Sequence, residues 1–240
     1  MSRPYVTPPQ AAPDGPTFPE LRSIYRRLLT RFGPQHWWPG DTPLEICVGA
    51  ILTQNTAWTN VEKAIANLRR ADLLDIQRLA ATPDAELAEH IRPSGYFNLK
   101  ARRLKGLVGF LLNHSGGDLP ALFAEPLATL RPRLLQVYGV GPETADSILL
   151  YAGGKATFVV DAYTIRIFTR LGMAPEGVAY HAMQAIFMSR MPPDVKLFNE
   201  YHALLVALGK DFCRPRRPRC GACPLEDICV AAGATAHEER

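Results

Sequence analysis

The chain has 240 residues, 47% of them hydrophobic, and its 27 basic and 23 acidic side chains leave a formal net charge of +4. That length supports one large core or two modest lobes. No apolar run approaches the roughly 20 residues that span a bilayer. The small net charge excludes a uniformly basic protein, so affinity for nucleic acid has to come from local patches.

The two ends of the chain predict no regular structure. Residues 1–16 contain five prolines and few residues that could form a core, so a disordered leader is expected there. Residues 234–240 predict a flexible tail. Between these ends, Thr17-x-x-Glu20 matches a capping box and opens the first helical run.

The interior pattern predicts helices throughout. Apolar residues recur at helical spacing, and helices are expected at 43–54, 57–70, 84–91, 98–113, 126–137, 143–153, 162–171, 178–190 and 195–209. The strand-like run 158–160 is too short to need a sheet partner. The sequence therefore predicts an all-α fold.

Two helical lobes are expected. The first is a helical barrel over 40–155, which includes a helix-hairpin-helix at about 134–152. The second combines 17–39 with 156–233 and contains the cysteine-rich segment.

Aromatic and polar residues interrupt the apolar pattern near the start of the first lobe. Trp37-Trp38-Pro39 precedes it, and Trp58 follows a helix tip that carries Gln54. Core packing explains tryptophans about as well as ligand binding does, and an ordinary helix end explains the polar tip. A second patch, 92–103, combines a glycine turn, aromatics and a basic helix start, which suits either capping or contact with DNA.

The segment around Gly139 and Gly141 carries the strongest signal. Apolar residues flank this Gly-x-Gly turn on both sides, which indicates two helices packed around a hairpin. Glycine allows the backbone to approach a ligand closely, and free N–H groups at a helix start suit a phosphate. Many helix connections use the same pattern, so the turn alone is weak evidence for DNA binding.

Asp161 follows Glu143 by 18 residues and begins the next apolar-periodic segment. An aspartate in that position is commonly a helix cap that accepts backbone hydrogen bonds. A catalytic carboxylate is the alternative, and the rest of the chain favours it.

Four cysteines lie close together near the C-terminus, namely Cys213, Cys220, Cys223 and Cys229. Four thiolates suit a [4Fe–4S] cluster or a four-cysteine zinc site. Disulfides fit poorly because no secretory signal is present and intracellular thiols stay reduced. Arg216 and Arg217 belong to a basic stretch between the first two cysteines, which offers a surface for phosphates.

Taken together, these motifs resemble the endonuclease III superfamily of DNA glycosylases. The cysteine spacing is the arrangement that this superfamily uses for its [4Fe–4S] cluster. The resemblance implies that the turn with Gly139, Gly141 and Thr144 holds a DNA backbone phosphate. It also implies that Gln54 fills the space left by a flipped nucleotide, and that Asp161 acts at the sugar.

One branch matches more closely, the endonuclease III-like 3-methyladenine DNA glycosylases. The shared elements are Trp37-Trp38-Pro39, Leu52-Thr53-Gln54-Asn55-Thr56 with Trp58, Arg92-Pro93-Ser94-Gly95, and Glu143. By that resemblance Trp37 or Trp38, Pro39, Trp58, Glu143 and Lys210 form the base pocket. Members of this branch need not carry the cluster, so the four cysteines of this chain are a departure from the branch's pattern.

Glu143 decides the expected reaction. Bifunctional relatives carry a lysine at this position, and an amine is required for the covalent Schiff-base route. The sequence therefore predicts a monofunctional glycosylase that removes alkylated purines such as 3-methyladenine from double-stranded DNA. A bifunctional oxidised-pyrimidine glycosylase/lyase and a non-catalytic DNA-binding protein are the alternatives. A monomer in the cytoplasm, associated with the nucleoid in a bacterium, is expected.

Overall fold

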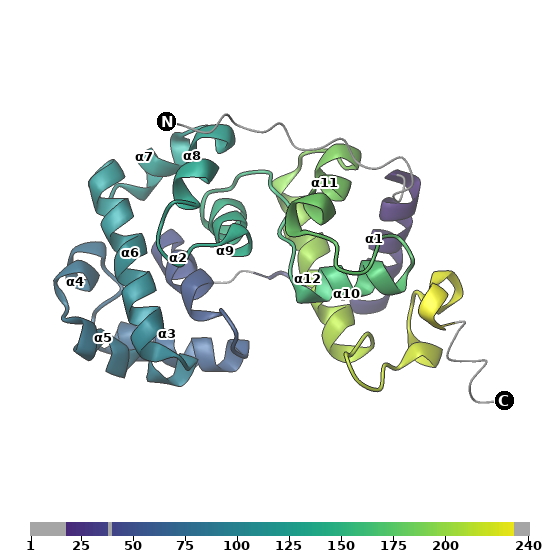
Figure 1. The fold of residues 1–240 in the computed structure, drawn as a ribbon, viewed down its shortest axis with the longest axis horizontal. Helices are drawn as coiled ribbons and strands as arrows, with labels where there is room; N and C mark the ends of the chain where they lie inside the picture. The colour runs from purple at the N-terminus through teal and green to yellow at the C-terminus, as the bar shows by residue number, and fades with distance from the viewer. Residues whose placement is uncertain (1–17, 38–39, 233–240) are drawn as a thin grey trace. The chain divides into compact units, whose positions relative to one another are not determined.

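The computed structural model describes residues 18–37 and 40–232, and within them every regular element is a helix (Figure 1). The all-α prediction is confirmed. The predicted leader and tail, together with Trp38 and Pro39, lie outside the described residues. None of the described helices is long and apolar enough to cross a membrane.

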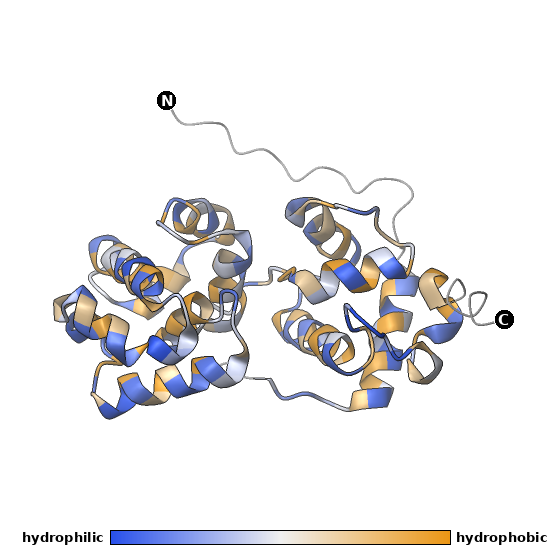
Figure 2. Ribbon diagram, turned by 60° about the horizontal axis from the view of Figure 1, so that its bottom comes forward, coloured by the Kyte–Doolittle hydropathy of each residue, from blue (hydrophilic) through white to orange (hydrophobic). Residues whose placement is uncertain are grey.

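The chain divides into two compact units, with boundaries after Trp37 and after Lys155. We call residues 38–155 the central unit, and residues 1–37 with 156–240 the terminal unit. Hydrophobic and hydrophilic residues alternate along the helices of both units, as amphipathic helices around a core require (Figure 2).

The central unit is built from short and medium helices. They are α2 (Pro43–Leu52), α3 (Trp58–Arg70), α4 (Ile76–Ala81), α5 (Asp84–His90), the 3-10 helix η1 (Arg92–Ser94), α6 (Phe97–Ser115), α7 (Leu119–Ala124), α8 (Leu127–Leu134), α9 (Pro142–Ser147) and the π-helix η2 (Ile148–Ala152) that continues α9.

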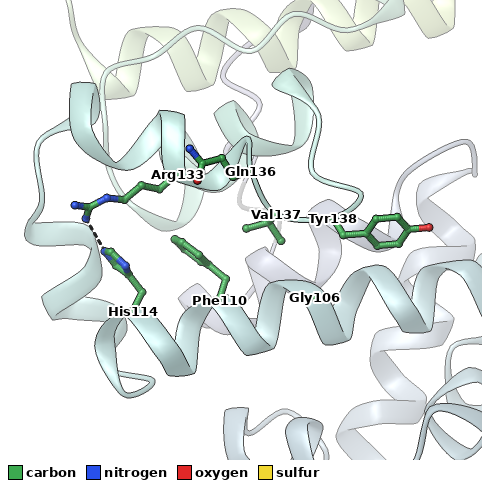
Figure 3. Close-up of a pocket in the computed structure, with 7 residues that line it drawn as sticks. All are labelled: Gly106, Phe110, His114, Arg133, Gln136, Val137 and Tyr138. Atoms are coloured by element: carbon green, nitrogen blue, oxygen red, sulfur yellow. Dashed lines mark hydrogen bonds between the residues drawn. The ribbon is translucent and has the colours of Figure 1, made fainter. Parts of the chain in front are cut away.

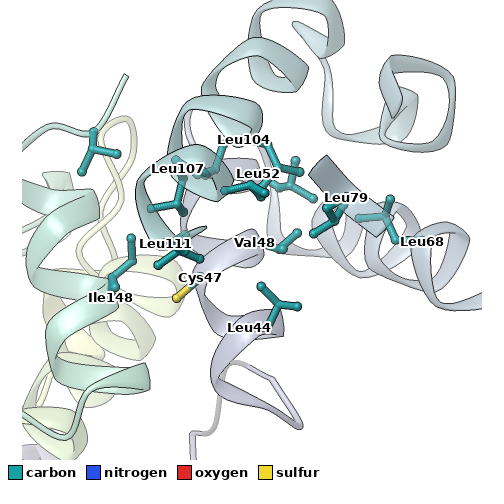
Figure 4. Packing of buried hydrophobic residues seen from close by; sticks show 14 of the residues in the cluster. Leu44, Cys47, Val48, Leu52, Leu68, Leu79, Leu104, Leu107, Leu111 and Ile148 are labelled. Atoms are coloured by element: carbon teal, nitrogen blue, oxygen red, sulfur yellow. The ribbon is translucent and has the colours of Figure 1, made fainter. Parts of the chain in front are cut away.

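Helix α2 forms the centre of this unit. All its residues from Leu44 to Leu52 are buried, and all of them except Glu45 are apolar, so this helix has to be surrounded by other elements. It packs against α3, α6 and η2, and Figure 4 shows Cys47 and Val48 among leucines of these neighbours. The Thr42 hydroxyl accepts the Glu45 N–H at 3.1 Å and so fixes where the helix begins.

Helices α4 and α7 are absent from the sequence predictions. Each spans six residues, which is too short for apolar periodicity to be recognised. An aspartate caps each one. Asp75 accepts the Arg78 N–H and Asp118 accepts the Ala121 N–H, both at 2.9 Å.

The terminal unit contains the first and the last helices of the described residues. They are α1 (Phe18–Phe32), α10 (Ala162–Arg170), α11 (Tyr180–Arg190), α12 (Val195–Asp211) and the 3-10 turns η3 (Cys220–Ala222) and η4 (Glu226–Ile228).

Aromatic packing holds this unit together around the strand-like run 158–160. Phe158 is fully buried and stacks on Phe187, with ring centroids 3.7 Å apart. Tyr201 of α12 meets the edges of both rings and donates its hydroxyl to the Leu21 carbonyl at 2.9 Å. The segment that leads into Asp161 is therefore a core element and needs no sheet.

Candidate catalytic and DNA-binding site

Helices α8 and α9 form the predicted helix-hairpin-helix, and the two glycines of its turn have different surroundings. Gly139 has a φ of +80°, and a Cβ there would lie 2.2 Å from Arg103 Cγ, so glycine is required. At Gly141, by contrast, no heavy atom of the described residues beyond its chain neighbours lies within 4 Å of the Cβ position. Among the described residues, no acceptor takes the backbone N–H of either glycine. The turn therefore offers two donors that another molecule can approach closely.

Gln54 is held against this turn. Its side-chain amide donates to the Gly139 carbonyl at 3.0 Å and to the Thr144 hydroxyl at 2.9 Å. Arg103 of α6 donates to the Gln54 Oε1 atom. The structure thus brings together three predicted DNA-binding residues, with Arg103 as a fourth member of the network.

Lys100 joins the end of α2 to the 3-10 helix η1, close to this network. Its ammonium donates to the carbonyls of Leu52 and Ser94, both at 2.7 Å, and the residue is 1% exposed. Burial, together with the positive charge of Arg103, lowers the pKa of Lys100 to about 8. Lys100 therefore fixes the end of α2, which leads into Gln54, to the Arg-Pro-Ser-Gly turn.

Glu143 and Trp58 stand in the first turns of α9 and α3. Glu143 is exposed, while Trp58 is half-buried against the core of the central unit, so packing accounts for part of its side chain. Asp146, three residues after Glu143, is fully buried, and Arg131 of α8 donates to both of its carboxylate oxygens at 2.8 Å. This ion pair ties α8 to α9 and fixes the hairpin that carries Glu143.

Asp161 is the N-cap residue of α10 in the terminal unit. Its Oδ1 atom accepts the N–H and the hydroxyl of Thr164 at 2.7 and 2.9 Å, so the N-cap is present. Its Oδ2 atom lies 3.5 Å from Nε2 of His202 on α12. Burial alone would raise the pKa of Asp161, but His202 and the Thr164 hydrogen bonds outweigh burial and lower the pKa below the usual value for an aspartate. The side chain is therefore a carboxylate at neutral pH.

Trp37 lies in the same unit, where its ring stacks on the His202 imidazole with centroids 5.3 Å apart and an interplanar angle of 15°. The segment before it is anchored to α12, because the Gln35 N–H donates to the Glu200 carboxylate at 2.6 Å. The tryptophan remains half-buried. Helix α12 thus positions both a predicted base-pocket residue and the predicted catalytic residue.

Arginines of α10 hold the cysteine loop that follows α12. Arg166 donates to the Cys213 carbonyl at 2.8 Å. Arg170 donates to the Arg214 carbonyl at 2.7 Å and lies 3.4 Å from Cys213 Sγ. The loop is therefore bound to the same helix that Asp161 caps.

The four thiols fit an iron–sulfur cluster. Burial raises the pKa of Cys223, and the nearby Cys213, Cys229 and Cys220 raise it further, which places all four thiols in one neighbourhood. In the described ranges, no three His, Cys, Asp or Glu side chains converge as the ligands of a single ion do. A [4Fe–4S] cluster needs no such convergence, because each of its four thiolates binds a different iron. A bound cluster would cross-link this loop.

Lys210, Arg216 and Arg217 are exposed on the terminal unit. Lys210 lies in the last turn of α12, and the two arginines lie within the cysteine loop. Arg217 has a φ of +50°, which residues other than glycine seldom adopt, so the loop bends sharply there.

A cavity of about 440 Å³ lies beside the hairpin in the central unit (Figure 3). It is lined by Gly106, Phe110, His114, Arg133, Gln136, Val137 and Tyr138. Arg133 and His114 both contact the Glu125 carboxylate at 2.7 Å, so the charges at its edge are already paired. None of the base-pocket residues that the structure describes lines this cavity.

Comparison with known proteins identifies the class that this fold defines. Residues 48–193 match the profile of HhH-GPD superfamily base excision DNA repair proteins, and residues 213–229 match the iron–sulfur binding domain of endonuclease III. The chain therefore belongs to the HhH-GPD superfamily of base excision DNA repair glycosylases. It acts on DNA and carries a [4Fe–4S] cluster, which confirms the superfamily, enzyme and cofactor predictions.

Individual relatives agree with this assignment. A Methanocaldococcus jannaschii protein provisionally named as a DNA repair glycosylase is 45% identical over 215 residues, covering 89% of this chain and 97% of that protein. Endonuclease III of Thermotoga maritima is 27% identical, covering 87% and 92%.

Solved structures give the same fold. The Helicobacter pylori 3-methyladenine DNA glycosylase MagIII, bound to 1,N6-ethenoadenine, is 30% identical with a TM-score of 0.69, covering 80% of this chain and 96% of that one. A trapped endonuclease III–DNA covalent intermediate has a TM-score of 0.80 at 22% identity, covering 92% and 99%.

Arg166, Arg170 and His202 have no counterpart in the sequence predictions, and Lys100 and Arg103 appear there only as members of the basic patch 92–103. His202 and Lys100 interrupt otherwise apolar helix faces, and a buried polar side chain needs a partner, which is a usable signal. Arg103, Arg166 and Arg170 give no such signal, because arginines on a helix commonly face solvent.

Proposed function

We propose that this enzyme is a monofunctional DNA glycosylase that hydrolyses the N-glycosidic bond of alkylated purines such as 3-methyladenine in double-stranded DNA. The observation that carries the proposal is Glu143 in the first turn after the hairpin, where lyase relatives have lysine. A carboxylate cannot form an imine. The 30% identity to an H. pylori 3-methyladenine glycosylase over most of both chains supports the substrate class.

Asp161 supplies the chemical step in this proposal. A carboxylate with a lowered pKa stays charged and stabilises the oxocarbenium-like sugar that forms as the base leaves. It also positions the attacking water. A base methylated at N3 is cationic and already a good leaving group, so the reaction needs little general-acid help.

Recognition of the base depends on its positive charge. Aromatic faces such as those of Trp37 and Trp58 attract a cationic ring by about 0.5–2 kcal/mol each, depending on desolvation, and Glu143 adds a negative charge. Trp38, Pro39 and Lys210 are the other residues proposed to contact the base. Damage also lowers the energy needed to flip the nucleotide out of the stack.

Two lysines of the central unit, Lys100 and Lys105, have partners that hold their amines in place. Lys100 has the lowered pKa that a nucleophilic amine needs, but it is buried and donates to two carbonyls. Lys105 donates to the carbonyls of Ala80 and Thr82. Neither amine is placed to attack a sugar.

Binding to the DNA backbone is assigned to the hairpin turn and the cysteine loop. The N–H groups of Gly139 and Gly141 are available to a phosphate, and Thr144 supports the turn. Gln54 has to release its bonds to Gly139 and Thr144 before it can enter the duplex.

Neutralising Arg216 and Arg217 with glutamine should weaken binding to damaged and undamaged duplexes alike. Each lost phosphate contact reduces the slope of log K against log salt by about 0.9, so the slope should flatten by up to about two units. Binding titrations at several salt concentrations measure it. The control replaces Arg22 and Arg26 with glutamine, which removes an equal charge from α1 and should flatten the slope less. A loss confined to damaged DNA would contradict the backbone role.

Glu143→Lys tests the proposed function directly. The variant should gain strand cleavage at abasic sites and a borohydride-trappable adduct, because it now carries an amine at the position of the lyase nucleophile. Release of 3-methyladenine should fall at least about tenfold, since like charges about 4 Å apart repel by roughly 1–4 kcal/mol in a partly hydrated site. Both rates are measured side by side with wild type.

Glu143→Gln is the matched control. It removes the charge without adding an amine, so it should lose part of the 3-methyladenine release and form no adduct. Unchanged release of 3-methyladenine by both variants would show that Glu143 does not face the base.

A further inference from the structure

We infer that His202 is a positioning residue that orients the catalytic carboxylate of Asp161 and couples it to the base-pocket ring of Trp37. The inference rests on the proposed catalytic role of Asp161 and goes beyond it by naming what sets the position of the reacting oxygen. All three residues belong to the terminal unit.

The two oxygens of Asp161 have separate partners. Oδ1 is occupied by the N–H and hydroxyl of Thr164, which fix it as a helix cap. Among the described residues, the contact of Oδ2 is with Nε2 of His202, 3.5 Å away. Oδ2 is therefore the oxygen left for chemistry, and His202 is the group that faces it. A separation of this length is expected before substrate binds, because catalytic hydrogen bonds commonly tighten only in the complex.

The burial of His202 requires an explanation. The residue is 4% exposed on the inward face of α12, where a polar ring is costly unless it is partnered. Packing alone would be served by phenylalanine, which is already used at Phe158, Phe187 and Phe198 around this helix. Unlike phenylalanine, the imidazole of His202 places a ring nitrogen against the Asp161 carboxylate.

His202 also contacts the ring of Trp37. The rings of Trp37 and His202 lie nearly parallel, and Glu200, on the same helix, holds the backbone of Gln35. A base bound at Trp37 therefore presses on the same imidazole that sets the position of Oδ2. Base recognition and carboxylate orientation share one side chain.

Two variants separate the two roles. His202→Phe keeps a ring against Trp37 but removes the nitrogen, whereas His202→Gln keeps a donor but removes the ring. Excision from methylated duplex DNA is measured under single-turnover conditions, across a pH range and at several enzyme concentrations, with an enzyme-free blank for acid depurination.

His202→Phe should lower the maximal excision rate by about 10- to 100-fold, the scale of one hydrogen bond to a charged group, with little change in the half-saturating enzyme concentration. Its rate should also begin to fall at a higher pH than that of wild type. The groups that act on Asp161 are His202 from α12 and Thr164 from its own helix. Without His202, burial is opposed by Thr164 alone, so the pKa of Asp161 rises and the carboxylate is lost earlier on acidification.

His202→Gln should have the opposite effect, changing the half-saturating enzyme concentration more than the maximal excision rate. Its maximal rate should stay within about tenfold of wild type, while the half-saturating concentration rises by about 2- to 10-fold, the scale of one aromatic pair. The acid limb of its pH profile should stay closer to that of wild type than the limb of His202→Phe.

Three outcomes would overturn the inference. The first is a wild-type rate and pH profile in His202→Phe. The second is an equal loss in both variants that follows a lowered melting temperature, which indicates a purely structural histidine. The third is a further loss from His202→Phe in an Asp161→Asn background, because a residue that acts through Asp161 has no effect without it. Failure of the catalytic proposal is recognised separately, since Asp161→Asn alone would then keep its excision activity.

Discussion

Asp161→Asn should lose about 10²–10³ of the base-excision rate while binding damaged duplex with wild-type affinity. Asparagine has nearly the same shape, and its carbonyl oxygen can still accept the Thr164 bonds that begin α10. What disappears is the negative charge that stabilises the developing cation on the sugar, and removing one such preorganised electrostatic group costs about that factor. Single-turnover release of 3-methyladenine and a binding titration measure the two quantities.

The matched control changes the cap without changing the charge. Thr164→Val removes the hydroxyl that donates to Asp161 Oδ1 but leaves the backbone N–H bond, so it should reduce the rate far less than Asp161→Asn. Wild-type turnover by Asp161→Asn would show that Asp161 serves only as a helix cap.

Cys223→Ala should abolish the visible absorption of the iron–sulfur cluster and lower the melting temperature of the protein by roughly 5–15 °C. Loss of a cross-link of comparable reach, a disulfide, costs about 2–5 kcal/mol, and each kcal/mol moves the midpoint by roughly 2–4 °C at this chain length. Metal binding contributes directly to folding free energy. The loop then depends on weaker ties, such as the Arg27–Asp227 ion pair to α1.

Cys47→Ala is the control for this prediction. Cys47 is fully buried in the central unit, and burial raises its pKa to about 12, so it is a packing residue and no thiolate ligand. The variant loses one thiol and some packing but should keep the visible absorption. Retention of colour by Cys223→Ala, or its loss from Cys47→Ala, would contradict the assignment of the four ligands.

The sequence allowed the hairpin and the cluster loop to be predicted because their signals are local. Gly139 occupies a positive-φ turn between two apolar segments, and the four cysteines lie within one short stretch. Long helices such as α6 and α12 also show enough periodicity to be recognised. The six-residue helices α4 and α7 do not.

The remaining features depend on contacts between residues far apart in the chain. Nothing near Asp161 indicates that His202 faces it or that Trp37 stacks on the same ring. The network of Gln54 with Arg103 and Gly139 likewise joins three separate segments. Periodicity places such residues on a helix face, but only the packed units decide which faces meet.

The most direct test of the monofunctional assignment uses the wild-type enzyme on methylated duplex DNA. Free base and strand breaks are quantified in the same reaction, before and after alkali, with borohydride present in a parallel sample. We expect release of 3-methyladenine, strands that break only after alkali, and no trapped adduct. Strand cleavage that keeps pace with base release, together with a borohydride-trapped adduct, would contradict it.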